Sequence, residues 1–202
     1  MSQYRIRFAS LEDAPALLGI YTPYVTGTTI TFEYEVPSVT EFEGRIASIS
    51  KSYPYLVCES SGIPVGYAYA SLYRTRAAYQ WDVETSIYLH PDAQGKGVAS
   101  ALYDALMALL VLQGVYNVYA CITHPNERSE RFHKSYGFQK VGVFQKAGYK
   151  FGRWCDVIWL EKPLHDRFGA PEPIKPVAML CRQEVQQILL QAEQRLLKSS
   201  IR

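Results

Sequence analysis

The sequence has few cysteines, almost no net charge and no long hydrophobic run. Its four cysteines, Cys58, Cys121, Cys155 and Cys181, include no CxxC pair. This spacing argues against a disulfide framework or a zinc cluster and favours free thiols in a reducing compartment. The formal net charge is +2 and the basic residues are scattered. We therefore expect neither nucleic acid nor an anionic membrane as a partner.

Segments that would direct the chain to a membrane are also missing. The N-terminus, Met1 to Arg7, lacks the apolar core of a signal peptide. The longest apolar run, Ala105 to Leu112, is much shorter than the ~20 residues that span a bilayer. We therefore expect a cytoplasmic protein that holds no metal ion. What is present, 48% hydrophobic and 20% charged residues, is typical of a globular protein with a substantial core.

The order of periodic segments predicts the fold class. Apolar residues that alternate with polar ones predict strands, and apolar residues at helical spacing predict helices. Strands are expected at residues 4–9, 55–59, 65–73, 85–89, 118–122, 139–144 and 154–160, and helices at residues 11–21, 39–50, 98–112 and 126–136. The Thr-rich, aromatic segment 26–35 is interpreted as a loop that leads into a strand. Together these elements predict a mixed α/β sheet.

The C-terminal part of the chain differs in composition. Residues 169–178 contain three prolines, which is typical of a linker, so we expect a domain at residues 1–168 and a separate segment at residues 169–202. That segment carries an amphipathic helix whose apolar face holds Val185, Ile188, Leu189, Ala192, Leu196 and Leu197. Such a face is buried against its own domain, in a dimer contact or on another partner.

The most informative segment lies between an expected strand and the longest expected helix. It includes Gln94, Gly95, Lys96, Gly97, Val98 and Ala99. Glycines let main-chain amides approach a bulky anion, and a helix start offers unsatisfied N–H groups and partial positive charge. This combination favours a pyrophosphate site. The alternative is a plain strand-to-helix turn. The segment matches neither a P-loop nor a GxGxxG motif.

The segment does match Gln/Arg-x-x-Gly-x-Gly/Ala, and the residues around it fit the same pattern. The matching positions are Gln94, Gly97, Ala99, Asn126, Ser129 and Gly137-Phe138. On this basis the sequence resembles the GNAT superfamily of N-acetyltransferases. Within it, the sequence is most similar to the phosphinothricin and methionine sulfone/sulfoximine acetyltransferases over about residues 4–162. Supporting stretches include Val83 to Leu89 and Lys150 to Asp156.

The resemblance implies a fold, a co-substrate and a binding mode. The fold would be a mixed, mostly antiparallel central sheet with helices on both faces. The co-substrate would be acetyl-CoA, with Gln94 to Ala99 at its pyrophosphate. Ile87, Tyr88 and Leu89 would pair with the pantetheine amides as an added strand does, and Asn126 would hydrogen-bond the same arm. A main-chain N–H near Tyr88 or Leu89 would donate to the oxyanion.

The resemblance also implies two catalytic residues. Glu84, at the start of a strand that leads to the cofactor segment, would take the proton from the acceptor amine. The other interpretation of Glu84 is a solvated carboxylate at a strand end. His133 lies seven residues after Asn126, where many members carry a tyrosine that protonates the departing thiolate, and an imidazole can exchange a proton near neutral pH. Its alternative is a histidine on a helix surface.

The acceptor would be a small, amino-acid-like amine. In the resembling enzymes, the region of Arg74, Thr75 and Arg76 contacts substrate, and arginine suits a carboxylate or phosphinate. Phe32 and Tyr34 resemble aromatic residues that line the acceptor pocket. The alternatives are an exposed strand end for the first group and ordinary core for the second. The resembling enzymes are commonly dimers, so we expect a homodimer.

Two other functions remain open at this point. The first keeps the chemistry but acetylates a protein N-terminus, a lysine or a polyamine, and Arg74 and Arg76 argue against a cationic acceptor of this kind. The second is a sensor that binds acyl-CoA without turnover. The presence of both Glu84 and His133 argues against a sensor.

Overall fold

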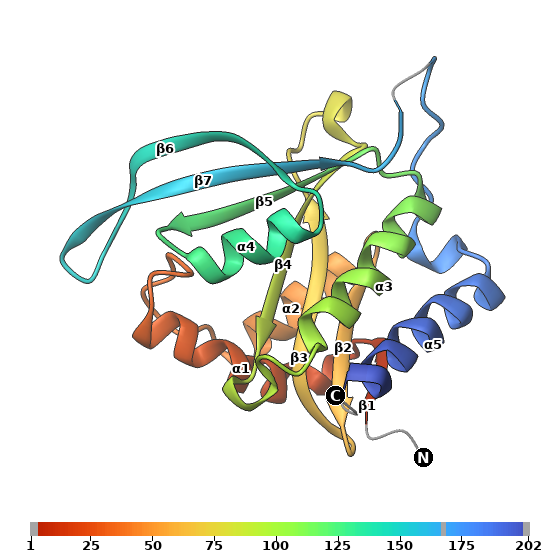
Figure 1. The fold of residues 1–202 in the computed structure, drawn as a ribbon, viewed down its shortest axis with the longest axis horizontal. Coiled ribbons are helices and arrows are strands. Elements are labelled where there is room, and N and C mark those ends of the chain that lie inside the picture. The colour runs from red at the N-terminus through yellow and green to blue at the C-terminus, as the bar shows by residue number, and fades with distance from the viewer. Residues whose placement is uncertain (1–3, 167–168, 200–202) are drawn as a thin grey trace.

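The computed structural model describes residues 4–166 and 169–199 of the 202-residue chain. A seven-stranded sheet with the order β1-β2-β3-β4-β5-β7-β6 runs through the molecule (Figure 1). Its strands are β1 (Tyr4–Phe8), β2 (Tyr55–Ser60), β3 (Ile63–Leu72), β4 (Asp82–Leu89), β5 (Asn117–His124), β6 (Gln139–Lys150) and β7 (Arg153–Pro163). Within this sheet only β4 and β5 pair in parallel, and all other neighbours are antiparallel.

Helices cover both faces of the sheet. They are α1 (Ala14–Gly27), α2 (Val39–Ser50), α3 (Val98–Gln113), α4 (Glu127–Ser135) and α5 (Arg182–Ser199). Strand β2 illustrates the division, because its side chains alternate between two cores. Tyr55 and Val57 pack beneath α1 and α2, whereas Leu56 and Cys58 pack in the core that contains α3. The predicted mixed, mostly antiparallel fold is confirmed.

Local sequence signals account for several element boundaries. The Ser38 hydroxyl accepts the amide hydrogen of Glu41, and the Glu41 carboxylate accepts that of Ser38, which forms a capping box at the start of α2. At the end of α3, Gly114 adopts a left-handed conformation with φ of 83°. A glycine does so without a Cβ collision, so the helix ends there. These boundaries agree with the sequence prediction.

The segment expected to lead into a strand does not form one. Helix α1 continues to Gly27, and residues 28–38 form a loop. The threonines in this segment bond locally instead of joining a sheet: Thr28 Oγ1 donates to the Tyr24 carbonyl, and Thr31 Oγ1 shares a hydrogen bond with the Tyr21 hydroxyl. Side-chain bonds of this kind compete with strand pairing.

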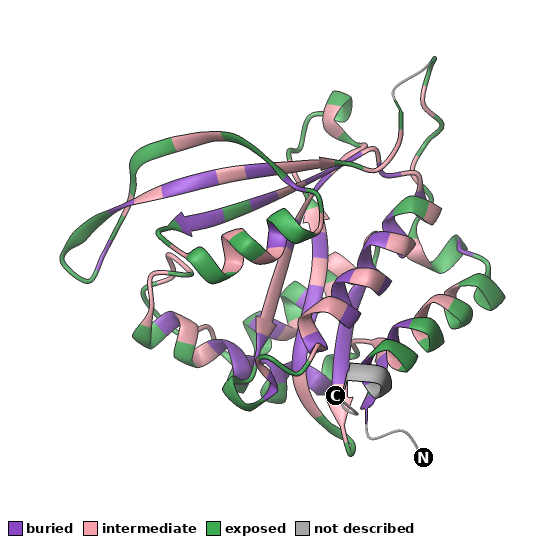
Figure 2. Cartoon of the chain, in the orientation of Figure 1, coloured by how far each residue is buried: buried purple, intermediate pink, exposed green. Residues whose placement is uncertain are grey.

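The β6–β7 hairpin is longer than predicted and extends beyond the other strands in Figure 1. Figure 2 shows why its pattern was hard to recognise, because β6 is exposed over most of its length while buried residues concentrate in the central strands and α3. The register also shifts twice along β6, near Gly142 and before Gly148. A strand exposed on both faces has no clear alternation for sequence reasoning to detect.

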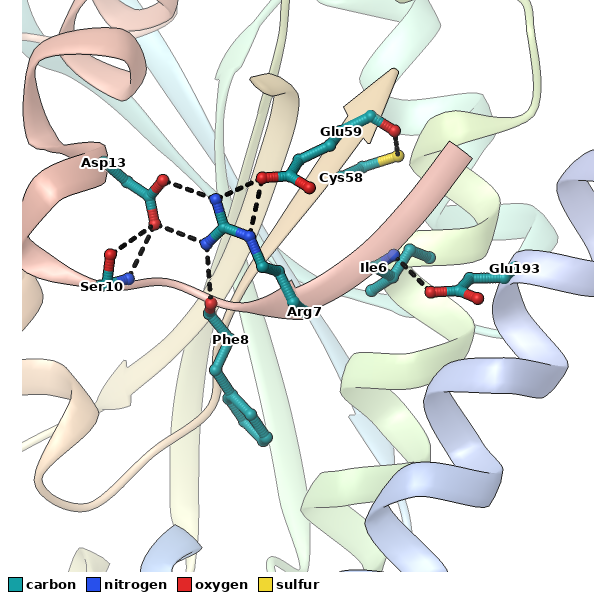
Figure 3. A network of polar contacts seen from close by, with 8 residues as sticks. All are labelled: Ile6, Arg7, Phe8, Ser10, Asp13, Cys58, Glu59 and Glu193. Carbon is teal, nitrogen blue, oxygen red and sulfur yellow. Dashed lines mark hydrogen bonds and ion pairs between the residues drawn. The ribbon is translucent and has the colours of Figure 1, made fainter. Parts of the chain in front are cut away.

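The C-terminal helix packs on its own chain. Helix α5 lies against α3 and β1 (Figure 1), with Ala192 and Leu196 buried. The Glu193 carboxylate accepts the main-chain N–H of Ile6 on the edge strand β1 (Figure 3). Hydrogen bonds hold the preceding segment to the domain: Trp81 Nε1 donates to the Glu172 carbonyl, and the Lys175 amide donates to the Gln113 carbonyl. The side chain of Leu197, expected on the same face, lies outside the described residues. Among the described helices, none combines the length and apolar character needed to cross a membrane.

Candidate active site

Strands β4 and β5 separate soon after they begin. They pair only at Asp82 with Asn117, Val83 with Val118, and Glu84 with Tyr119. Beyond the last pair lies a small cavity of about 70 Å³ between the two strands. It is lined by residues 85–88 of β4 and 120–123 of β5, together with Ile30, Asn126, Ser129 and His133.

The separation leaves the β5-facing side of β4 without a partner strand. The main-chain N–H and C=O of Leu89 point to this side, and both bond to the Tyr24 hydroxyl at 3.3 and 2.7 Å. Because main-chain groups alternate along a strand, those of Ile87 face the same side, whereas Tyr88 pairs with Tyr67 of β3. A ligand with amide groups can therefore add to β4 at Ile87, and at Leu89 it meets the Tyr24 hydroxyl.

A larger cavity of about 820 Å³ continues from this opening to the start of α3. Its volume is typical of a site for an elongated small molecule. Gly95 and Gly97, with φ of 76° and 81°, form the turn before the helix, and no side chain caps the first turn of α3. The free amides and the helix dipole suit the diphosphate of a nucleotide-like co-substrate.

The predicted cofactor residues divide into those that line the cavity and those that do not. Ile87, Leu89, Gln94, Gly95, Gly97, Ala99 and Asn126 line it. Tyr88 instead lines the small cavity. The Lys96 side chain is exposed, and Val98 is buried in the core, so Val98 can contribute only its main chain. The Asn126 side chain caps α4 by accepting the Ser129 amide hydrogen.

Glu84 sits at the last paired position of β4 and β5. It is half-buried, and this burial raises the pKa of its carboxyl group. Burial and the nearby Glu84 carboxylate together raise the pKa of the Cys121 thiol to about 12. Thr85, the next residue of β4, and Cys121, two residues beyond the Tyr119 that pairs with Glu84, both line the small cavity, so Glu84 lies next to the opening along the strand. A carboxylate with a raised pKa is better suited to accept a proton near neutral pH than an ordinary one.

His133 is buried, with 4% of its surface exposed, and both of its ring nitrogens have partners. Nδ1 lies 2.8 Å from the Ser129 carbonyl oxygen, and Nε2 lies 2.9 Å from the Tyr103 hydroxyl. A carbonyl oxygen can only accept, so Nδ1 carries the hydrogen and Nε2 of the neutral ring accepts from Tyr103. Burial lowers the pKa of His133, which keeps the ring neutral.

Glu84 and His133 approach the opening from opposite faces of the sheet. Side chains alternate along β4. Glu84 shares a face with Tyr88, which packs beneath α1 and α2. Thr85 points the other way, and its Oγ1 lies 3.0 Å from the Tyr103 hydroxyl of α3. The site therefore offers a proton acceptor on one side and a hydroxyl–imidazole chain on the other.

Comparison with known proteins assigns this arrangement to a family. Residues 6–159 match the family described as the acetyltransferase (GNAT) domain. The chain belongs to the GNAT acetyltransferases. Its match ends at residue 159, so α5 lies outside the GNAT segment.

The alignment of this chain with each of three named GNAT relatives covers nearly the whole relative. A phosphinothricin N-acetyltransferase of Streptomyces coelicolor is 38% identical over 168 residues, which cover 81% of this chain and 98% of the relative. An L-methionine sulfoximine/L-methionine sulfone acetyltransferase of Salmonella typhimurium is 32% identical over 171 residues, which cover 83% of this chain and 98% of the relative. The crystal structure of a phosphinothricin acetyltransferase from Sinorhizobium meliloti in complex with acetyl-CoA aligns with a TM-score of 0.77 and 33% identity. The alignment covers 89% of this chain and 96% of that structure.

None of the predicted acceptor residues lines either described cavity. Arg74, Thr75 and Arg76 are exposed on the loop after β3, where the Arg74 guanidinium stacks on the Tyr73 ring. Phe32 packs against Gly148, and Tyr34 is 68% exposed and donates its hydroxyl to the Tyr149 carbonyl.

Several residues of the GNAT site were not identified from the sequence. Ile30, on the same loop as Phe32, borders both cavities. Tyr24, Tyr103 and Arg128 were missed because their partners lie far away in the chain, and Arg128 contacts Gln94 across the larger cavity. The one signal in the sequence was Tyr103, a residue with a polar hydroxyl group within the mostly apolar helix α3. In the described part of the chain, no cluster of His, Cys, Asp or Glu side chains could hold a metal ion.

Proposed function

We propose that this protein transfers the acetyl group of acetyl-CoA to the primary amine of a small, amino-acid-like acceptor. The observation that carries the proposal is the separation of β4 and β5, because it joins an amide-lined cavity to a small opening beside Glu84. The phosphinothricin and methionine sulfone acetyltransferases among its relatives support this class of acceptor.

The donor-binding half of the site is the larger cavity. The amides around Gly95 and Gly97 and the uncapped start of α3 hold the pyrophosphate. The main chain of Ile87 pairs with the pantetheine amides, and Asn126 bonds the same arm from the opposite wall. Bound acetyl-CoA supplies the thioester carbonyl that the amine attacks.

Glu84 prepares the acceptor for attack. A primary amine is mostly protonated at neutral pH and becomes nucleophilic only after it loses a proton. The Glu84 carboxylate accepts this proton, directly or through one water. The C–N bond then forms, the C–S bond breaks, and the departing thiolate takes a proton. A main-chain N–H on the unpaired side of β4 donates to the oxyanion during the step. The N–H groups of Tyr88 and Leu89, which the sequence suggested for this role, have partners in β3 and in the Tyr24 hydroxyl.

His133 contributes from the other face of β4. Its Nε2 is bonded to Tyr103, and Tyr103 is bonded to Thr85 on the cavity wall. His133 therefore acts on the reacting groups through two hydroxyl groups. Nε2 carries no hydrogen at rest, so along this chain it first takes up the second proton that the amine nitrogen loses as the C–N bond forms, and then returns it to the departing thiolate.

The proposal is tested by measuring CoA release from acetyl-CoA with an amine panel. Methionine sulfone and phosphinothricin represent the expected acceptors, and a peptide N-terminus, a lysine peptide and a polyamine represent the alternatives. Turnover concentrated on the amino-acid-like amines is the expected result. Turnover confined to peptides or polyamines contradicts the acceptor class, and acetyl-CoA binding without turnover on any amine supports a sensor instead.

The proposal extends to assembly and location. Exposed apolar side chains on the β6–β7 hairpin, including Phe144, Phe151 and Trp154, support an interface in a homodimer. All four cysteines are free thiols, which supports a reducing compartment such as the cytoplasm. Sedimentation velocity on the purified chain tests the dimer, and a monomer at micromolar concentration contradicts it.

A further inference from the structure

The far end of the β6–β7 hairpin holds the segment of residues 28–34, named here the acceptor loop. Three consecutive residues of β6 make the contacts. Gly148 packs against the Phe32 ring, the Tyr149 carbonyl accepts the Tyr34 hydroxyl, and Lys150 reaches the main chain on either side of the loop's start.

Lys150 is a buried cation that binds main-chain oxygens. It is 2% exposed, and its Nζ donates to the carbonyls of Val25 at 2.7 Å and Thr31 at 2.8 Å. The first carbonyl belongs to the last turn of α1 and the second to the acceptor loop. A buried ammonium group is stable only when its hydrogens have acceptors. Lys150 therefore fixes the path of the chain as it leaves α1.

At Gly148 the two segments approach each other closely. A Cβ atom added at this position would lie 2.3 Å from the nearest ring atom of Phe32, far inside van der Waals contact. Any larger residue must therefore displace the Phe32 ring, which the acceptor loop carries. Gly142 on the same strand has nothing within 4 Å of such an atom.

The acceptor loop reaches the opening through Ile30 and Thr31. Ile30 lines both the small cavity and the larger one. The Thr31 hydroxyl shares a hydrogen bond of 2.7 Å with the Tyr21 hydroxyl. The Tyr21 ring packs edge-to-face on the Tyr88 ring, with 4.9 Å between the ring centroids. A shift of the loop at Phe32 or Thr31 is therefore transmitted to residues that border the opening.

We propose that Gly148 and Lys150 are positioning residues that hold the acceptor loop against the opening and thereby set which amines reach Glu84. The inference rests on the proposed acetyl transfer and deepens it, because it assigns acceptor selection to a strand far from the β4–β5 opening. The two residues act through Ile30 and Phe32 and touch neither substrate.

The decisive experiment compares Gly148→Ala with Gly142→Ala. At saturating acetyl-CoA, Gly148→Ala is expected to raise the KM for methionine sulfone by roughly tenfold, about the effect of one methylene group in a pocket. The KM for acetyl-CoA should rise less, because the loop contributes Thr28 and Ile30 to the donor cavity while the turn at Gly95 and Gly97 and the Asn126 wall stay in place. Gly142→Ala, on the same strand but in open space, should match wild type. Adding Phe32→Leu to Gly148→Ala should restore most of the acceptor affinity.

Hydrogen–deuterium exchange gives a second readout that needs no activity. The amides of residues 28–34 should exchange faster in Gly148→Ala and in Lys150→Met, and at the wild-type rate in Gly142→Ala. If Gly148→Ala does not fold, Lys150→Met decides the question with the same two measurements.

The outcomes separate this inference from the proposed function. An unchanged acceptor KM together with unchanged exchange overturns the positioning role. An equal rise in both KM values overturns it too, because a general loss of structure would then explain the data. A wild-type chain that acetylates none of the amines refutes the proposed function, while the exchange data still decide whether the hairpin holds the loop.

Discussion

The Tyr103 hydroxyl lies 2.9 Å from Nε2 of His133, inside the core between α3 and α4. The same hydroxyl lies 3.0 Å from Oγ1 of Thr85 on β4. Because the Ser129 carbonyl requires the hydrogen on Nδ1, Tyr103 is the donor to the neutral ring. The histidine that the sequence suggested as a proton donor is thus connected to the opening by a buried chain of hydrogen bonds.

Removing the central hydroxyl should interrupt this chain. We expect Tyr103→Phe to lower kcat roughly 10²-fold, near the lower end of the effect of general acid–base catalysis, with little change in either KM. Tyr136→Phe is the matched control, because its hydroxyl bonds Ser100 and Asp104 and lines neither cavity.

A double-mutant cycle distinguishes a joint role from two separate ones. If Tyr103 and His133 act as one unit, Tyr103→Phe combined with His133→Asn should be about as slow as the slower single variant. Additive losses would mean that His133 acts independently of Tyr103.

Glu84→Gln should lower turnover by roughly 10²–10⁴-fold, the usual effect of a general base, while the KM for acetyl-CoA changes little. Burial raises the pKa of Glu84, so in wild type the acid limb of kcat/KM should have its midpoint above the ordinary carboxyl value of 4.5. The limb should disappear in the Gln variant. Glu184→Gln, on the exposed side of α5, serves as the control. A wild-type rate in Glu84→Gln would remove Glu84 from the mechanism.

The same carboxyl group should make the fold less stable as pH rises. With its pKa raised in the folded state, Glu84 binds its proton more tightly there than in the unfolded chain. Stability then falls as pH increases from 4.5 to the raised value and stays lower above it. We expect Glu84→Gln to melt at a higher temperature than wild type at pH 7, with the difference vanishing below pH 4.5. Equal melting temperatures at both pH values would show that burial of the charge has no net effect.

The cofactor segment can be tested by crowding one glycine. Gly97→Val should raise the KM for acetyl-CoA, because Gly97 lines the larger cavity and has φ of 81° at the start of α3. Gly62, in the β2–β3 turn, has φ of 83° and open space around it. Gly62→Val therefore has the same backbone strain, roughly 1–2 kcal/mol, without the effect on binding. If both variants raise the KM equally, strain alone explains the result.

Local signals made a large part of this structure predictable from the sequence. Ser38 marks the start of α2, and Gly97 and Gly114 lie on either side of α3. These signals act between residues a few positions apart, so they need no knowledge of the fold. The mixed sheet followed from the order of such elements.

The parts that were missed depend on contacts between distant residues. Tyr24 meets Leu89, Tyr103 meets His133, and Lys150 meets Val25, and no pattern within any one segment encodes these pairs. The segment after α1 was expected to lead into a strand because threonine and aromatic residues favour strands, yet its side chains are satisfied within a loop. The cofactor segment was predictable because its function depends on main-chain geometry, whereas the acceptor side depends on packing.

The Arg7 network joins the first strand to the rest of the domain, and it gives the last prediction. Figure 3 shows the Arg7 guanidinium between the carboxylates of Asp13 and Glu59, with bonds of 2.7 Å to each. Burial alone would raise the pKa of Asp13, but the bonds from Arg7 and the Ser10 amide outweigh it and lower that pKa. The stabilisation is therefore present above the ordinary value of 3.8 and is lost as pH falls through the lowered pKa.

Arg7→Met should leave two partly buried carboxylates without their cation. We expect a loss of roughly 3–5 kcal/mol in the free energy of unfolding at neutral pH, as for other broken buried pairs. The loss should shrink as pH falls, because burial then dominates and Asp13 protonates at a higher pH than in wild type. Arg5→Met, two residues away on the same strand and exposed, should unfold at nearly the wild-type denaturant concentration. Adding Asp13→Asn to Arg7→Met should recover part of the stability. A pH-independent loss in the single variant would mean that Arg7 stabilises β1 through packing of its side-chain carbons and not through its charge.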